Sequence, residues 1–176
     1  RTHFMENPVA KKLFYRNALG DADDFWSWVK PRAAHPGLAF VPAAGAGAHC
    51  RVLLDLGLAS EVIANDLSEE FAMAANAAFE ASGYRILYRA GDLNILALAD
   101  QTFDACYAFH ALHHLINLED FFERLRRSLQ KSNGDLFVED YVGPRFMQPP
   151  PCLPDRINQY LSRMPKRLRL DRQGRE

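Results

Sequence analysis

The chain has 176 residues, of which 48% are hydrophobic and 24% charged, and its formal net charge is -1. This composition fits one globular domain with a sizeable core, and the charge gives no general attraction to nucleic acid or to an anionic membrane. No run of apolar residues is long enough to cross a bilayer, so membrane insertion is not expected.

The cysteines and the chain ends indicate the cellular setting. Cys50, Cys106 and Cys152 lack the paired spacing of a disulfide framework or a zinc site, and we expect no metal. The start, residues 1–4, lacks the apolar core of a signal peptide, which favours a cytoplasmic protein. Because the chain begins without Met and ends in a charged stretch, we expect a piece of a longer protein.

Short strand-like runs alternate with amphipathic helix-like runs between Leu38 and Val142. This alternation is typical of a parallel sheet covered by helices on both faces, so the predicted fold is α/β with a doubly wound, mostly parallel sheet. The predicted strands are Leu38 to Pro42, Glu61 to Asn65, Arg85 to Arg89, Phe103 to Phe109 and Asp135 to Val142.

Helices are predicted between these strands. The first runs from about His49 to Leu56, and Ser68 caps the second with its side chain. A third begins near Asn117 and ends at Ser132-Asn133-Gly134. The predicted core-facing stripes are Val52, Leu53 and Leu56 in the first helix, Phe71, Ala74, Ala75, Ala78 and Phe79 in the second, and Leu118, Phe122, Leu125 and Leu129 in the third.

Two further segments flank this alternation. Pro8 to Val29 is predicted to be helical with a break at Gly20-Asp21, which makes residues 1–37 an N-terminal helical cap. Residues 145–176 are predicted to form a basic helical extension, with eight basic and three acidic side chains from Arg145 onward. Such a charge run is more typical of a solvated helix face than of a binding patch.

A loop of small residues follows the first predicted strand and leads to the first helix, in the order Pro42-Ala43-Ala44-Gly45-Ala46-Gly47. Small side chains let a ligand lie against the backbone, and the helix start offers free N–H groups. Asp66 ends the next strand 21 positions after Gly45, where a carboxylate can accept hydrogen bonds from a ribose diol. Asp92 follows the third strand and is either an adenine ligand or an ordinary turn residue.

The segment Phe103-Asp104-Ala105-Cys106-Tyr107-Ala108-Phe109-His110-Ala111-Leu112-His113-His114-Leu115 resembles the fourth-strand motif of class I S-adenosylmethionine-dependent methyltransferases. The resemblance runs from Leu38 to Pro144 and implies an S-adenosylmethionine-binding domain over 38–144. It also implies S-adenosylmethionine as cofactor and S-adenosylhomocysteine as product.

This resemblance implies roles for individual residues. The loop would lie under the methionine part, Asp66 would hold the ribose, and Asp92 would contact the base. The implied cofactor-binding residues are Ala44, Gly45, Ala46, Gly47, Asp66, Leu67, Asp92, Leu93, Phe109 and His110. His110 and His114 are candidate proton acceptors for the methyl-accepting group, and the alternative is that these histidines only cap or hydrogen-bond the chain.

The sequence departs from the family at two positions. Ala43 replaces the carboxylate usually found two residues before the first glycine, and His49 stands where a third glycine is common. Two alternatives therefore stay open, a catalytically silent adaptor with this fold and a nicotinamide-dependent oxidoreductase. Against the oxidoreductase, Ala48 and His49 would crowd a pyrophosphate.

The acceptor of the methyl group is not readable from the sequence. We expect transfer to an O, N or C atom of a small metabolite or saccharide, in preference to nucleic acid. The family usually adds an antiparallel pair of strands after the fifth, and no alternating run follows Val142. The domain is therefore expected to be C-terminally incomplete, with an open sheet edge that favours a further domain or self-association.

Overall fold

The computed structural model describes residues 8–20, 22–34, 36–129, 133–140 and 159. The chain divides into two compact units, Arg1–Tyr141 and Val142–Glu176. Every helix and strand given below lies in the first unit. The end of the last predicted strand and nearly all of the predicted extension 145–176 lie outside the described residues.

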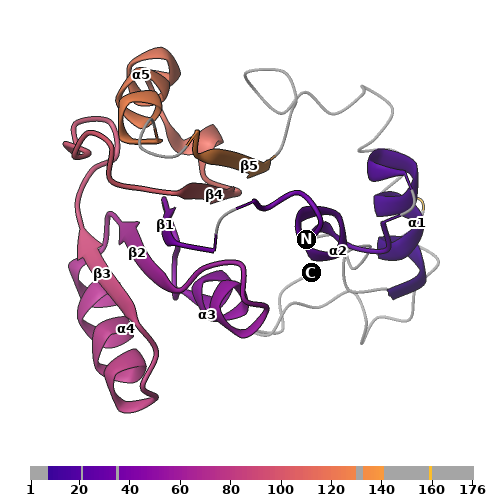
Figure 1. Ribbon diagram of the computed structural model, residues 1–176, viewed down its shortest axis with the longest axis horizontal. Coiled ribbons are helices and arrows are strands. Elements are labelled where there is room, and N and C mark those ends of the chain that lie inside the picture. Colours follow the sequence, from indigo (N-terminus) through magenta and orange to yellow (C-terminus); the bar gives the residue numbers. More distant parts are fainter. Residues whose placement is uncertain (1–7, 21, 35, 130–132, 141–158, 160–176) are drawn as a thin grey trace. The chain divides into compact units, whose positions relative to one another are not determined.

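The first unit is built on a sheet of five parallel strands in the order β3-β2-β1-β4-β5 (Figure 1). The sequence order reverses between β1 and β4, which is the doubly wound arrangement that the sequence predicts. The strands are β1 (Leu38–Val41), β2 (Glu61–Asp66), β3 (Ile86–Ala90), β4 (Ala105–Phe109) and β5 (Asp135–Glu139).

Helices cover both faces of this sheet. α3 (Ala48–Asp55) and α4 (Glu69–Ala81) lie on one side, and α5 (Leu118–Leu129) lies on the other (Figure 1). A short 3-10 helix, η2 (Leu112–His114), follows β4. The connection from β3 to β4, residues 91–104, contains no helix.

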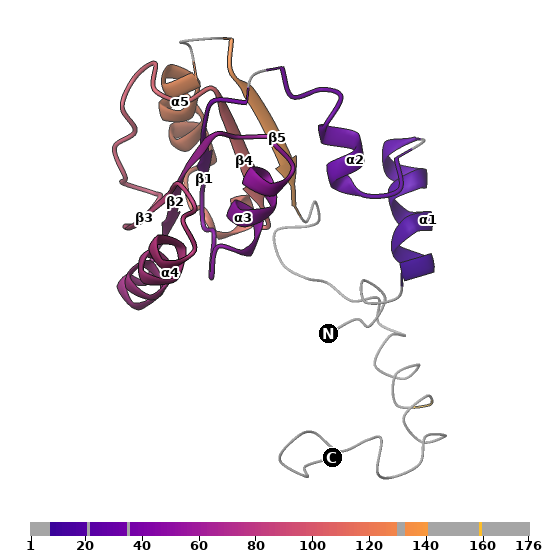
Figure 2. The same cartoon turned by 60° about the horizontal axis from the view of Figure 1, so that its bottom comes forward.

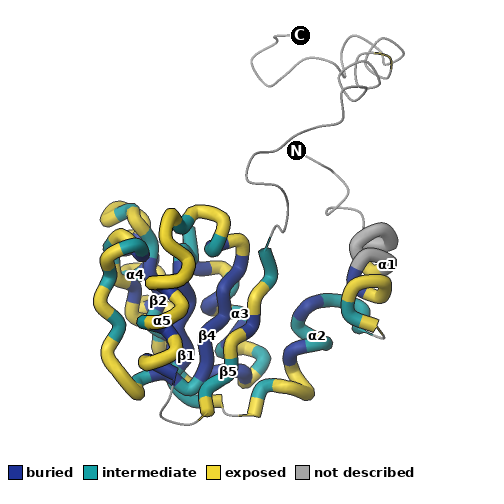
Figure 3. Tube along the Cα trace, turned by 90° about the horizontal axis from the view of Figure 1, so that it is seen from above, coloured by how far each residue is buried: buried dark blue, intermediate teal, exposed yellow. Residues whose placement is uncertain are grey.

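The core forms two layers, one on each face of the sheet. All five residues of β4 are buried, as expected for a central strand covered on both sides. Tyr107 of β4 packs toward the α3 and α4 side, whereas Phe40 of β1 packs toward α5. Figure 2 shows the central strands between the helices, and in Figure 3 their buried residues form the dark blue centre of the unit.

The predicted apolar stripe of α4 is confirmed at Ala75 and Phe79 and wrong at Phe71, Ala74 and Ala78. Its buried residues are Ala72, Ala75 and Phe79, whereas Phe71 is half exposed. Almost every side chain from Phe71 to Phe79 is apolar, so periodicity could not select the buried face. Asn76 helps to fix it, because its amide bonds both the N–H and the C=O of Tyr88 in β3.

The predicted stripe of α5 is wrong in its first turns. Phe121, Leu125, Ser128 and Leu129 are buried, whereas Leu118 and Phe122 are exposed. Phe121 and Phe122 are adjacent and chemically alike, so the sequence alone did not show which of them faces the sheet.

Two helices precede the sheet, and Gly20 separates them, as predicted. They are α1 (Pro8–Leu19) and α2 (Phe25–Val29), and Gly20 takes a left-handed φ of 77°. The hydroxyl of Tyr15 donates to the carboxylate of Glu139 at the end of β5. Phe25 packs edge-on against Phe109 of β4 at 5.3 Å.

Among the described residues, no helix is long and apolar enough to span a membrane.

Candidate functional site at the carboxyl edge of the sheet

A cavity of about 550 Å³ lies where the carboxyl ends of the strands meet. Parallel strands bring their following loops to one edge, and the crevice at the reversal of strand order is the usual ligand site of such sheets. Four separate chain segments line the cavity, with the residues Ala43, Gly45, Asn65, Asp66, Leu67, Gly91, Asp92, Leu93, Asn94, His114 and Leu115.

The loop after β1 and the end of β2 are joined by a direct hydrogen bond. The N–H of Gly45 donates to Oδ2 of Asp66 at 2.8 Å, and the N–H of Ser68 donates to Oδ1 at 3.2 Å. A carboxylate has about four lone-pair sites, so Asp66 can still accept two further hydrogen bonds. The structure therefore holds this carboxylate beside the loop in a fixed orientation.

A residue that the sequence analysis missed holds the other side of this loop. The hydroxyl of Tyr88, in β3, donates to the C=O of Gly45. Burial and the nearby Asp66 carboxylate raise the pKa of Tyr88, so its hydroxyl stays a neutral donor. The alternating pattern of β3 indicates that Tyr88 faces inward, but no local signal predicts its contact with Gly45.

The two glycines of the loop differ in their surroundings. A Cβ added at Gly47 would meet the Phe79 ring at 2.8 Å, and its φ is +75°. A Cβ at Gly45 would meet nothing within 4 Å, and its φ is +55°. Gly47 is thus required by packing and backbone conformation, whereas Gly45 leaves open space beside the cavity.

Asp92 forms the turn that its alternative interpretation predicts, at the mouth of the same cavity. Its Oδ1 accepts hydrogen bonds from the backbone N–H of Asn94 at 2.9 Å and from the Asn94 side chain at 2.8 Å. These hydrogen bonds lower the pKa of Asp92, so its carboxylate is ionised at neutral pH. A turn role and a ligand role are compatible here, since Asp92 is exposed and lines the cavity.

Asn65 is a second cavity residue that the sequence analysis missed. Its side chain is buried, and Nδ2 donates to the C=O of Arg89 at 3.2 Å and of Gly91 at 3.0 Å. These bonds fix the end of β3 and the start of the loop that carries Asp92. The signal in the sequence is a single amide that directly follows the apolar run Val62 to Ala64 and directly precedes Asp66.

The three histidines after β4 occupy different positions. His114 lines the cavity, and its ring lies 4.0 Å from that of His113. Nδ1 of His113 lies 2.6 Å from Oδ1 of Asp140, a nearly buried carboxylate that the sequence analysis did not single out. His110 is exposed, has a φ of 49°, and donates its N–H to the C=O of Glu139 at 2.7 Å.

Phe109 is not among the residues that line this cavity. Its buried ring packs against His49 at 4.4 Å and against Trp26 at 5.0 Å. His49, at the position of the usual third glycine, thus belongs to an aromatic cluster under α2. The predicted contacts of Phe109 and His110 with a cofactor stay predictions.

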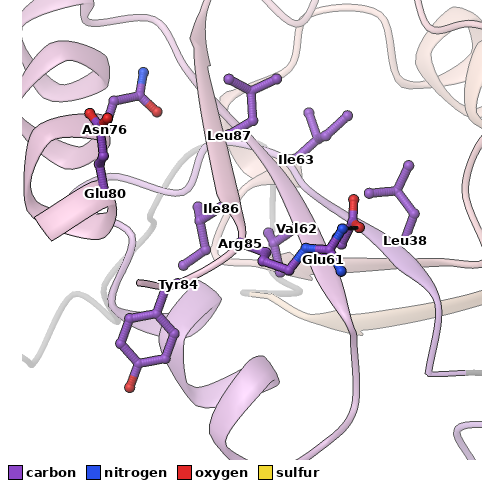
Figure 4. A pocket seen from close by; sticks show the side chains of 10 residues that line it. All are labelled: Leu38, Glu61, Val62, Ile63, Asn76, Glu80, Tyr84, Arg85, Ile86 and Leu87. Carbon is purple, nitrogen blue, oxygen red and sulfur yellow. Dashed lines mark ion pairs between the residues drawn. The ribbon is translucent and has the colours of Figure 1, made fainter. Parts of the chain in front are cut away.

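A different cavity, of about 580 Å³, lies beside the amino end of β3 (Figure 4). Several of its polar side chains already have partners: Arg85 pairs with Glu61, and the Tyr84 hydroxyl donates to Asp55. Figure 4 shows Leu38, Ile63 and Leu87 pointing to one side of the sheet. This cavity gathers no loop or carboxylate from the carboxyl edge, so the candidate site is the first one.

A family model described as "Methyltransferase domain" matches residues 41–138. The chain belongs to this family. The matched range of the methyltransferase domain begins at the last residue of β1 and ends within β5, so it includes the loop, Asp66 and Asp92. No curated protein matches the chain.

Solved structures agree with this assignment. An S-adenosylmethionine-dependent methyltransferase from Mesorhizobium loti is 28% identical with a TM-score of 0.50, over 59% of this chain and 48% of that one. The YcgJ protein from Bacillus subtilis has the same fold, with 22% identity and a TM-score of 0.55 over 77% of this chain and 56% of that one. The chain spans about half the length of these relatives. The resemblance to class I methyltransferases and the predicted fold class are confirmed.

Proposed function

We propose that the chain binds S-adenosylmethionine in the cavity at the carboxyl edge and transfers its methyl group to a small-molecule acceptor. The observation that carries this proposal is the hydrogen bond between Gly45 and Asp66. It brings a glycine loop and a carboxylate together at one cavity, which supports binding of a nucleoside with an attached amino acid.

The residues of the cavity fit the parts of this cofactor. The ribose diol would donate to the free lone pairs of Asp66, and the adenine would lie between Leu67 and Leu93. Leu67 is 73% exposed and lines the cavity, so a bound base would cover it. Asp92 would accept from the exocyclic amine, and the methionine part would follow the loop from Ala43 to Gly47, of which Ala43 and Gly45 line the cavity. A volume of about 550 Å³ is within the usual range for such ligands.

The bound cofactor would supply an activated methyl group on its sulfonium, and the protein would contribute alignment of the acceptor atom and exclusion of water. The predicted helical cap of residues 1–37 is the segment that we propose to shape the acceptor site. Family members commonly vary in such added segments, and function resides in the site and not in the fold.

Histidines are the proposed proton acceptors for an acceptor hydroxyl or amine. His114 has the better position of the two candidates because it lines the cavity, and an imidazole nitrogen can act as a general base. His110 lies at the carboxyl end of β4 and is the second candidate. A small metabolite or saccharide with an O–H or N–H group suits a site with such a proton acceptor.

Isothermal titration calorimetry with S-adenosylhomocysteine tests the proposal and separates an enzyme from a silent adaptor. We expect saturable binding to the parent chain and a large loss in Asp66→Ala. Asp55→Ala is the matched control, since this carboxylate also accepts a hydrogen bond, from the Tyr84 hydroxyl, but lies outside the cavity. No heat with the parent, or equal affinity for the parent and Asp66→Ala, would refute the proposed site.

A further inference from the structure

Arg124 of α5 donates hydrogen bonds to the loop that lines one side of the cavity. Its NH2 donates to the C=O of Leu93 at 2.9 Å and of Asn94 at 3.2 Å, and its NH1 donates to the C=O of Leu96. Its Nε donates to Asp120 on the same helix at 2.9 Å. The side chain is only 12% exposed, so these bonds form largely out of water.

The loop that Arg124 binds carries the proposed base-binding residues. Asp92 and Leu93 line the cavity, and residues 91–104 lack a helix to stiffen them. The later part of this connection is anchored on α5 by other bonds, such as Ser128 Oγ to the C=O of Ala99 at 2.8 Å. Near the cavity, the side chain of Arg124 supplies the bonds from α5.

A guanidinium suits this task for a physical reason. It is planar, always charged, and presents five N–H donors in a fixed fork, so one side chain can satisfy several carbonyl oxygens at once. A lysine ammonium at the same place has no such fork. Holding three carbonyls of one short loop therefore fixes both the position and the orientation of that loop.

Asn94 links the same loop to the segment after η2. Its Oδ1 accepts from the N–H of Ile116 at 2.9 Å, while its Nδ2 donates to Asp92. The Asp92 carboxylate is thus oriented by Asn94, whose own C=O is held by Arg124. Hydrogen bonds thus connect Arg124 of α5 to Asn94, and Asn94 to Asp92 at the cavity.

We infer that Arg124 is a positioning residue for the base side of the cofactor site, where it holds the loop of Asp92 and Leu93 so that the cavity selects an adenine by its exocyclic amine. This inference rests on the proposed function. It extends that function to Arg124, a residue of α5 that does not itself line the cavity.

The test compares two nucleosides in binding, without any methyl acceptor. S-adenosylhomocysteine and its 6-oxo counterpart, S-inosylhomocysteine, differ at the group that Asp92 would bind. Calorimetric affinities of both are measured for the parent, Arg124→Met and Arg124→Lys. Arg126→Met is the matched control, because Arg126 lies on the same helix but is exposed and pairs only with Glu123 in the described part of the chain.

We expect the parent and Arg126→Met to prefer the adenine compound by the same factor. Arg124→Met should bind S-adenosylhomocysteine about tenfold more weakly and lose most of this preference, the scale of loss when a supporting residue is removed. The affinity of Arg124→Lys for S-adenosylhomocysteine, and its preference for the adenine compound, should lie between those of the parent and those of Arg124→Met. A general loss of stability would weaken the binding of both compounds equally. A change in the preference between them is therefore specific to positioning.

Hydrogen exchange gives a second readout that does not need the ligand. Amides of residues 93–96 should exchange faster in Arg124→Lys than in the parent, while those of β4 stay protected. An unchanged preference in both Arg124 variants, or a parent with equal affinity for the two compounds, would overturn the inference while the proposed function stands. A parent that binds neither compound would refute the proposed function itself.

Discussion

The backbone N–H of Gly45 donates a 2.8 Å hydrogen bond to the carboxylate of Asp66, across 21 residues of sequence. This bond fixes the loop after β1 against the end of β2. Tyr88 holds the same loop from β3 through the C=O of Gly45. The proposed cofactor site is therefore organised before any ligand binds, which lowers the entropy that binding must overcome.

The two loop glycines should respond differently to alanine. Gly47→Ala should lower the free energy of unfolding by about 2 to 4 kcal/mol, because its Cβ meets the Phe79 ring and its φ is +75°. Gly45→Ala should cost only about 1 kcal/mol of stability but weaken S-adenosylhomocysteine binding at least about tenfold, because its Cβ enters open space beside the cavity. Urea unfolding and calorimetry measure the two effects. Equal binding by Gly45→Ala and the parent would contradict the assignment.

Ala43→Asp should tighten S-adenosylhomocysteine binding by about 1 to 2 kcal/mol, the scale of a hydrogen bond to a charged group. Ala43 lines the cavity and has a φ of 46°, a conformation that aspartate tolerates better than alanine. The restored carboxylate would accept from the cofactor's ammonium. Titration calorimetry on a variant with an unchanged melting temperature measures this effect. Unchanged or poorer affinity would mean that another group already holds the ammonium or that this cavity does not hold the cofactor.

Stability should fall in alkali because of a buried thiol. Burial in α3 raises the pKa of Cys50 to about 12, whereas an unfolded chain ionises this thiol near 9. The neutral thiol stabilises the fold fully below pH 9, and this contribution is lost as the pH rises toward 12. The slope reaches about 1.4 kcal/mol per pH unit for one group. Urea unfolding from pH 8 to 11 should show a shallower decline in Cys50→Ala, and identical slopes would refute this cause.

Removing the Tyr15 hydroxyl should loosen α1. Tyr15→Phe removes a hydrogen bond to the Glu139 carboxylate and should cost about 1 to 2 kcal/mol. Amides of α1 should then exchange faster while those of β1 do not change. A double-mutant cycle with Glu139→Gln should give a coupling energy of about 1 kcal/mol, and strictly additive effects would mean that the contact contributes nothing.

Much of the fold could be predicted from the sequence because its signals are local. The predicted strands agree with the observed ones within two residues wherever the structure describes them, since a buried parallel strand is a short apolar run between turn residues. The helix faces were less certain: α4 is apolar nearly all round, and the bond from Asn76 to Tyr88 that fixes its orientation joins two elements.

The candidate site was predictable in part for the same reason. Gly45 and Asp66 carry a spacing signal, and the structure joins them. Asn65, Tyr88 and Arg124 act by binding backbone atoms of segments distant in sequence, so no pattern around them reveals the partner. Such contacts follow only from the packed arrangement of strands and helices.

Chemical-shift mapping with S-adenosylhomocysteine tests the central claim most directly. In ¹⁵N–¹H spectra of the parent chain, titration should move the amide signals of Gly45, Asp66, Leu67 and Leu93, the residues around the cavity at the carboxyl edge. Signals of Ile86 and Leu87, beside the cavity at the amino end of β3, should stay in place. No shift at saturating ligand, or shifts that gather around Ile86 and not around Gly45, would contradict the proposed cofactor site.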